Sequence, residues 1–195
     1  HAAAEWAESP DTLELAKEAV RHGDIVIVNL LFLEEHLQAI LPTLRARRVD
    51  CDAMVGMISA PEIVSLTRMG DLDMSKPSSG AMKLLKKLRG SKSPSASSGE
   101  KQMRMLRRLP KILRFVPGKA QDLRAWFMTM LYWLGGSDDN VEQMVSFLVG
   151  RYAAASTLRG AEAAPPIDYP DVGLYHPDLP GHPITTDLGA LPQPK

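Results

Sequence analysis

The sequence predicts an α/β fold in which an incomplete parallel sheet is followed by an all-helical part and a proline-rich irregular tail. Helical and strand-like patterns alternate over residues 1–74, the strand pattern stops after Gly70, and prolines gather beyond residue 153. Alternation of this kind is typical of parallel strands joined by crossover helices. We therefore divide the chain into an α/β, Rossmann-like portion (1–74), a helical portion (75–153) and a tail or connector (154–195).

The first helix and strand have clear local signals. Ser9 and Pro10 resemble a cap and a first helical residue, and Gly23 ends the element. Apolar residues follow Pro10 at helical spacing: Leu13, Leu15, Ala16, Ala19 and Val20. Residues 24–29 (DIVIVN) then form a β-branched run, which indicates a central strand covered on both faces.

A second helix and strand follow. Residues 33–47 have a helical pattern in which Pro42 predicts a kink or an early end, and residues 52–58 are a second apolar run. Ser59 to Glu62 (SAPE) matches a capping box, so we expect a third helix that closes at Gly70. Two strands cannot form a sheet covered on both faces. We therefore expect that a first strand is missing and that the chain is an internal fragment.

The middle of the chain is predicted to be helical. Two basic helices, 75–89 and 100–115, flank a flexible linker at 90–99, and Pro110 interrupts the second of them. Residues 119–134 predict a helix with a broad apolar face, and Ser137 should cap a last helix from Asp138 to about Ala153. The residues expected to face inward are Leu123, Trp126, Phe127, Met130, Leu131, Trp133 and Leu134, then Val141, Met144, Val145, Leu148 and Val149.

Charge is strongly segregated, although the formal net charge is zero. Residues 1–75 carry a net charge of −7, residues 76–124 of +12 and residues 125–195 of −5. The basic segment could attract nucleic acid. It contains one aromatic residue, Phe115, and no nucleic-acid motif, so a solvated or partner-facing surface is the better interpretation. The residues we single out for partner contact are Lys83, Lys86, Lys87 and Arg89.

Several classes of function have no support in the sequence. It contains no phosphate-binding loop, metal-ligand spacing or nucleophile elbow, so we expect no catalytic residue and no metal site. The single Cys51 is expected to be a small buried residue. No apolar run is long enough to span a membrane and no signal peptide is evident, which predicts a soluble cytoplasmic protein.

One segment is a candidate ligand or partner site. Residues 29–36 (NLLFLEEH) lie where the first strand passes into a helix, and open α/β sheets bind ligands at the carboxyl ends of their strands. Glu34, Glu35 and His36 are therefore candidate ligand or partner residues. The competing structural interpretation is that the two glutamates stabilise the helix N-terminus through its dipole.

Five stretches of the sequence occur in a recognisable order. The longest is LRRLPKILRFVPGKAQD at 106–122, and the others are 24–35, 59–62, 132–137 with Asn140, and 170–178. Together they resemble the large, porphyrin-binding H subunit of magnesium chelatase. The run LPGHP at 179–183 is nearer to the versions from bacteria that make bacteriochlorophyll than to those of plants.

The resemblance implies a function that composition and periodicity do not show. Large subunits of this family bind protoporphyrin IX and act with two smaller, AAA+-related subunits to insert Mg²⁺ at the cost of ATP hydrolysis, in the cytoplasm or at the periphery of the photosynthetic membrane. No catalytic residue is carried over, and we expect the chain alone to bind none of these cofactors and to be inactive. Two alternatives remain open: the large subunit of a cobaltochelatase, and a freestanding basic interaction module.

Overall fold

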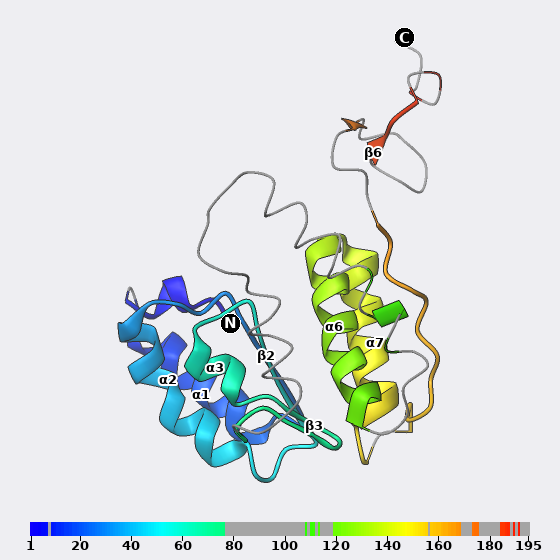
Figure 1. Ribbon diagram of the computed structural model, residues 1–195. Helices are drawn as coiled ribbons and strands as arrows, with labels where there is room; N and C mark the ends of the chain where they lie inside the picture. Colours follow the sequence, from blue (N-terminus) through cyan, green and yellow to red (C-terminus); the bar gives the residue numbers. More distant parts are fainter. Residues whose placement is uncertain are drawn as a thin grey trace, which may run out of the picture.

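The computed structural model describes residues 1–7, 9–76, 108, 110, 111, 113, 119–155, 157–168, 173–175, 184–187, 189 and 191 (Figure 1). The first part contains the 3₁₀ helix η1 (Ala3–Trp6) and the helices α1 (Pro10–His22), α2 (Glu34–Arg47) and α3 (Pro61–Ser65). Its strands are β1 (Ile25–Asn29), β2 (Ala53–Met57), β3 (Arg68–Met69) and β4 (Leu72–Asp73). The predicted α/β class is confirmed.

The sheet has the order β1-β2-β3-β4 and is mixed. β1 and β2 are parallel, with Ile25 opposite Ala53 and Asn29 opposite Met57. β3 pairs antiparallel with β2, and β4 pairs antiparallel with β3. The expectation that strands stop after Gly70 was wrong. Gly70 adopts a left-handed φ of 52° and turns the chain into the β3–β4 hairpin instead of closing a helix. A further strand beside β1 stays a prediction.

The third helix is shorter than predicted, and its capping box does not form. α3 has five residues, its N-cap is Ala60, and no side chain caps it. The Ser59 hydroxyl instead accepts a hydrogen bond from the Leu31 backbone N–H at 3.2 Å and donates one to the Met57 carbonyl at 2.9 Å. This hydroxyl ties two loops together, so it is not available to the helix.

Two apolar cores lie on opposite faces of the sheet. Val26 and Met54 pack with α2 residues on one face, and Val55 and Met57 pack with α6 (Lys119–Gly135) and α7 (Asp138–Tyr152) on the other. The helices therefore sandwich β2, all five residues of which are buried (Figure 1). α2 continues through Pro42 without ending there. Leu15, one of the apolar residues at helical spacing in α1, is exposed.

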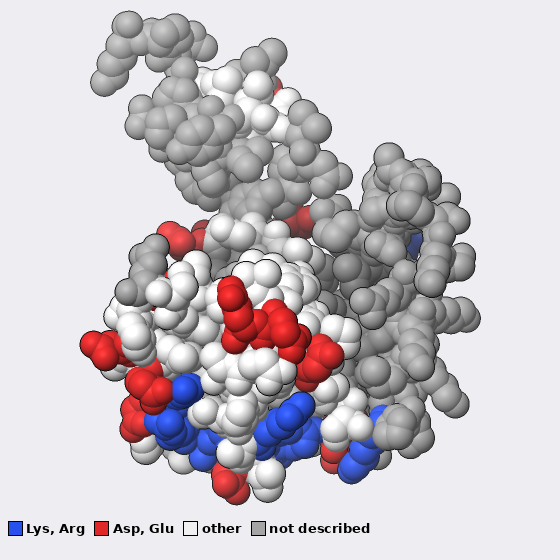
Figure 2. All heavy atoms as spheres, turned by 90° about the vertical axis from the view of Figure 1, so that its left-hand side faces the viewer, with Lys and Arg blue, Asp and Glu red and all other residues white. Residues whose placement is uncertain are grey.

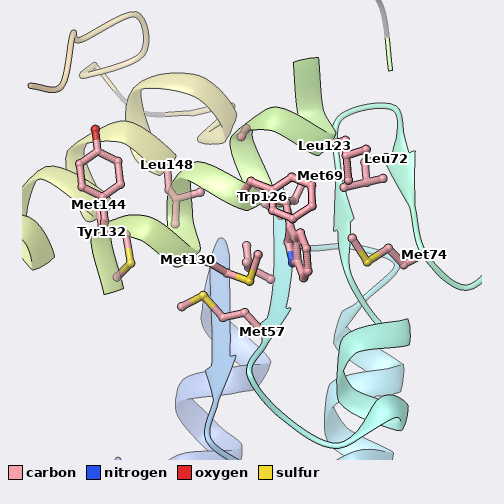
Figure 3. Packing of buried hydrophobic residues seen from close by; sticks show 14 residues of the cluster. Met57, Met69, Leu72, Met74, Leu123, Trp126, Met130, Tyr132, Met144 and Leu148 are labelled. Carbon is pink, nitrogen blue, oxygen red and sulfur yellow. The ribbon is translucent and has the colours of Figure 1, made fainter. Parts of the chain in front are cut away.

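The α6–α7 hairpin is partly as predicted. Trp126, which Figure 3 shows among the packed apolar side chains, and Phe127 are buried, and their rings meet edge to face at 5.0 Å. Ser137 caps α7 by accepting a hydrogen bond from the Asn140 N–H. Trp133 is only partly buried. Leu134, Val141 and Val145 are exposed, contrary to expectation.

The inward stripe of α7 is centred on Asn140, Met144 and Leu148. Asn140 is buried because its side-chain amide bonds both backbone groups of Ile167: Nδ2 donates to the carbonyl at 3.1 Å and Oδ1 accepts from the N–H at 2.9 Å. The side-chain amide of Asn140 thus forms paired hydrogen bonds with the backbone of an extended segment beyond α7. Because Asn140 faces inward, Val141 and Val145 face outward.

The segment beyond α7 runs back along the hairpin. The Tyr132 hydroxyl donates to the Ala164 carbonyl at 2.5 Å, and the Ala164 N–H donates to Gln143 Oε1 at 2.8 Å. Farther on, β5 (Leu174–Tyr175) and β6 (Ile184–Thr185) form an antiparallel pair. The prediction of an entirely irregular tail was therefore wrong. The two short strands can form because the prolines of the tail lie outside them.

Asp122, in α6, connects the β3–β4 hairpin to α7. Its carboxylate accepts hydrogen bonds from the Asp71 N–H at 2.9 Å and the Tyr152 hydroxyl at 2.8 Å, and it lies 3.6 Å from the Arg151 guanidinium. Burial, reinforced by the bond to Asp122, raises the pKa of the Tyr152 hydroxyl well above its usual value. Tyr152 therefore remains a neutral donor throughout the physiological range.

The Asp73 carboxylate predicts a pH-dependent contribution to stability. Burial raises its pKa, but hydrogen bonds from Ser75 and the nearby Arg48 guanidinium outweigh burial and lower the pKa to about 2. A lowered pKa stabilises the fold above the unfolded value near 3.8, and this contribution is lost as pH falls through about 2. We expect Asp73→Asn to cost about 1–2 kcal/mol at neutral pH, and the difference from wild type to vanish in acid. Urea unfolding of both proteins along a pH series would measure this, and a difference independent of pH would contradict it.

Candidate functional site

The carboxyl ends of the parallel strands β1 and β2 lie side by side, and the loops that follow them form one structure. The Leu30 N–H donates to the Ile58 carbonyl at 3.0 Å, and the Ala60 N–H donates to the Leu31 carbonyl at 2.9 Å. The bond from the Leu31 N–H to Ser59 Oγ adds a third link. This is the edge at which the sequence predicted a ligand or partner site.

Both loops begin with a residue in a strained backbone conformation. Leu30 has a φ of 56° and Ile58 a φ of 45°, in the left-handed region that bulky and β-branched residues rarely occupy. Each costs about 1–3 kcal/mol, and such residues cluster at functional sites. The hydrogen bond between these two residues helps to hold the conformation.

The loop after β1 exposes large apolar side chains. Leu30, Phe32 and Leu33 are 58%, 57% and 57% exposed, whereas Leu31 between them is buried. We call Leu30, Phe32, Leu33, Glu34 and Glu35 the carboxyl-edge patch. Single exposed apolar residues are common on protein surfaces, but neighbouring ones mark interaction sites.

The predicted residues Glu34, Glu35 and His36 form the first turn of α2. Glu35 Oε1 lies 3.8 Å from His36 Nε2, but the three side chains do not form a common cluster. Glu34 accepts a hydrogen bond from Gln38 at 2.6 Å, and the Glu35 side chain is 76% exposed. The His36 side chain is mostly buried, with its ring edge-on to Trp6 at 5.5 Å. The position of both glutamates also suits the dipole of α2. A role in ligand or partner binding stays a prediction.

Two buried polar atoms at this edge have no hydrogen-bond partner among the described residues: Trp6 Nε1 and Asn29 Oδ1. Asn29 is the last residue of β1, and Trp6 contacts His36. Unpaired buried polar atoms are uncommon and costly. Trp6 was not predicted from the sequence, and Asn29, Leu30, Phe32 and Leu33 lay within the candidate segment 29–36 but were not singled out as site residues. The only signal was an apolar run, LLFL, placed between a strand and a helix.

Other predicted features are placed as follows. Lys83, Lys86, Lys87 and Arg89 lie outside the described residues. Cys51 is buried, as expected. In the described part of the chain, no group of three or more acidic, histidine or cysteine side chains could hold a metal ion. No helix in that same part has the length and apolar character needed to cross a membrane.

Comparison with known proteins gives both a family match and close relatives. Residues 1–127 match the family described as Domain of unknown function (DUF3479). Over its whole length the chain is 65% identical to the magnesium-chelatase H subunit of Rhodobacter capsulatus and 63% identical to that of Cereibacter sphaeroides. Over 81% of its length it is 29% identical to the chloroplastic magnesium-chelatase ChlH subunit of Oryza sativa subsp. indica.

The chain spans only part of these relatives: 16% of each bacterial protein and 11% of the rice protein. The resemblance to the H subunit of magnesium chelatase, which five short stretches indicated, is confirmed along the full length of the chain. Because the family match extends over residues 1–127 and includes the whole mixed sheet, the chain belongs to the DUF3479 domain family.

Proposed function

We propose that this chain is part of the porphyrin-binding H subunit of a magnesium chelatase, which inserts Mg²⁺ into protoporphyrin IX at the expense of ATP in (bacterio)chlorophyll biosynthesis. The observation that carries the proposal is the 65% and 63% identity, along the entire chain, to two bacterial magnesium-chelatase H subunits. The partners are then the remainder of the H subunit and two smaller AAA+-related subunits.

The relatives also favour this proposal over both alternatives. The matched bacterial and rice proteins carry magnesium-chelatase names, which supports magnesium over cobalt as the inserted metal. The alignment with one part of a longer protein supports a component of a complex over a freestanding basic interaction module.

Within that larger protein, we propose that the described residues supply a folded scaffold and a contact surface. At the carboxyl edge of the sheet, the exposed side chains are mainly apolar groups and carboxylates, and no three acidic, histidine or cysteine side chains of the described residues form a common cluster. General acid–base catalysis and metal binding both require convergent groups. Mg²⁺, ATP and porphyrin are therefore substrates and ligands of the whole complex, and we assign no catalytic residue here.

A chimeric protein tests the function. This chain would replace the 65%-identical segment of the Rhodobacter capsulatus H subunit, and formation of Mg-protoporphyrin would be followed with the two smaller subunits and ATP. We expect the chimera to retain activity within about tenfold of the parent protein, about 1.4 kcal/mol in activation free energy.

Two controls make the result interpretable. A parent protein from which the segment has been deleted sets the baseline, and the chain added alone to the smaller subunits should give no product. A folded chimera that binds porphyrin but matches the deletion variant in activity would contradict the proposal.

A further inference from the structure

We propose that the carboxyl-edge patch is a docking surface for a partner protein, and that the partner presents a segment of apolar side chains flanked by Lys or Arg. This inference rests on the proposed function, in which the chain works beside other chelatase subunits. It extends that function by assigning a contact surface and the chemistry of the segment that binds it.

The apolar half of the patch is exposed and held in place. Leu30, Phe32 and Leu33 are each more than half exposed, although Leu31 between them is 5% exposed. Three hydrogen bonds tie this loop to residues 58–60, and Leu30 is held in the left-handed conformation. A surface fixed in advance loses little conformational entropy on binding. The loop therefore presents these side chains ready for contact.

Carboxylates predominate over cationic side chains around the patch. The three segments that meet at this edge, 1–7, 29–38 and 58–65, contain Glu5, Glu34, Glu35 and Glu62 and no Lys or Arg. Figure 2 shows a group of acidic side chains in the middle of the face formed by α1 and α2, and below it Lys and Arg side chains with further acidic side chains beside them. The negative potential here would attract a cationic segment and repel phosphate-bearing surfaces such as nucleic acid or anionic lipid.

The glutamates of the patch are not neutralised by cations in the described part of the chain. Glu34 accepts a hydrogen bond from the uncharged Gln38, and Glu35 Oε1 lies 3.8 Å from Nε2 of His36 but forms no ion pair with a Lys or Arg of the described residues. By contrast, Glu14 and Glu18 on α1 pair with Lys17 and Arg21. The patch thus combines exposed apolar area with carboxylates that have no Lys or Arg partner among the described residues, and a basic, apolar protein segment complements both features.

The experiment uses the chimeric protein and, as probes, each of the two smaller chelatase subunits. One variant reverses charge (Glu34→Lys with Glu35→Lys), and one removes apolar area (Phe32→Ser with Leu33→Ser). Matched controls make the same changes elsewhere. They are Asp11→Lys with Asp50→Lys at exposed acidic positions, and Leu15→Ser with Val49→Ser at exposed apolar positions. Association would be measured by biolayer interferometry at about 50 mM and about 500 mM salt, after circular dichroism has verified the fold.

We expect both patch variants to weaken association with one smaller subunit by about tenfold at low salt, and both controls to stay within about twofold. At high salt the charge-reversal variant should approach the unmutated chimera, because salt screens exposed charges, whereas the apolar variant should remain weak.

Three outcomes would overturn the docking inference. They are unchanged association of both patch variants, a change in the mass of the chimera that reveals a second copy as the occupant, and weaker porphyrin binding with unchanged association. In each case an active unmutated chimera would leave the proposed function intact. An inactive unmutated chimera would instead contradict the proposed function itself.

Discussion

Trp126→Ala is expected to lower the free energy of unfolding by about 3–5 kcal/mol. Trp126 is 3% exposed in the core between β2 and α6 (Figure 3). Its ring meets that of Phe127 edge to face. Its indole Nε1 donates a hydrogen bond of 3.0 Å to the Gly56 carbonyl, which is buried in the sheet. Removal of the side chain leaves a large cavity and takes one donor away from a buried acceptor, so two unfavourable effects combine.

Urea unfolding followed by far-ultraviolet circular dichroism would measure this loss without reliance on tryptophan fluorescence. Trp126→Phe keeps a ring in the core but lacks the donor, so we expect an intermediate loss of about 1–3 kcal/mol. Leu15→Ala, at a side chain that is 59% exposed, is the control and should change stability by about 0.5 kcal/mol or less. Equal midpoints for Trp126→Ala and the control would refute the assignment of Trp126 to the core.

The elements that sequence reasoning located correctly have strong local signals. α1 lies between Ser9 and Gly23 as predicted, and β1 and β2 coincide with the two apolar runs. The β3–β4 hairpin was missed because strands of two residues are too short to show a period of two. Thr67, which bonds both backbone groups of Gly56, helps to hold β3 beside β2, and this long-range contact leaves no local pattern.

The orientation of α7 shows a second limit of pattern reading. Apolar spacing placed Val141 and Val145 inside, whereas the structure buries the polar Asn140. What decides the orientation is the pair of hydrogen bonds from its amide to Ile167, a residue 27 positions away. A polar side chain with a buried partner outweighs two valines at the margin of the apolar stripe, because an unpaired amide or peptide group in the core is costly.

The candidate site was located by topology alone. Parallel strands place their carboxyl ends at one edge, so the segment 29–36 could be assigned to that edge from the sequence. The left-handed conformations of Leu30 and Ile58 could not be assigned, because both residue types normally avoid that region. They arise where two loops bond to each other, and this pairing becomes visible only in the folded chain.

Gly56→Ala is expected to destabilise the fold by about 3 kcal/mol or more. Gly56 lies in the middle of β2, where α3 approaches so closely that an added Cβ would lie 2.3 Å from the Ile63 carbonyl oxygen and 2.8 Å from its carbonyl carbon. Because both are backbone atoms, no side-chain rotation can relieve the overlap. A shift of β2 away from α3 would disturb the Thr67 and Trp126 hydrogen bonds that converge on Gly56.

A comparison of two glycines separates this steric effect from ordinary glycine flexibility. Gly136 has a φ of 66°, and its nearest contact to an added Cβ is 4.0 Å away, so Gly136→Ala should cost only about 1–2 kcal/mol from backbone strain. The effect at Gly56 should be larger, and Ile63→Ala in the same chain should not rescue it, because the overlap is with the main chain of Ile63. Rescue by Ile63→Ala, or equal losses at the two glycines in urea unfolding, would show that the close approach of α3 to β2 does not determine the residue at position 56.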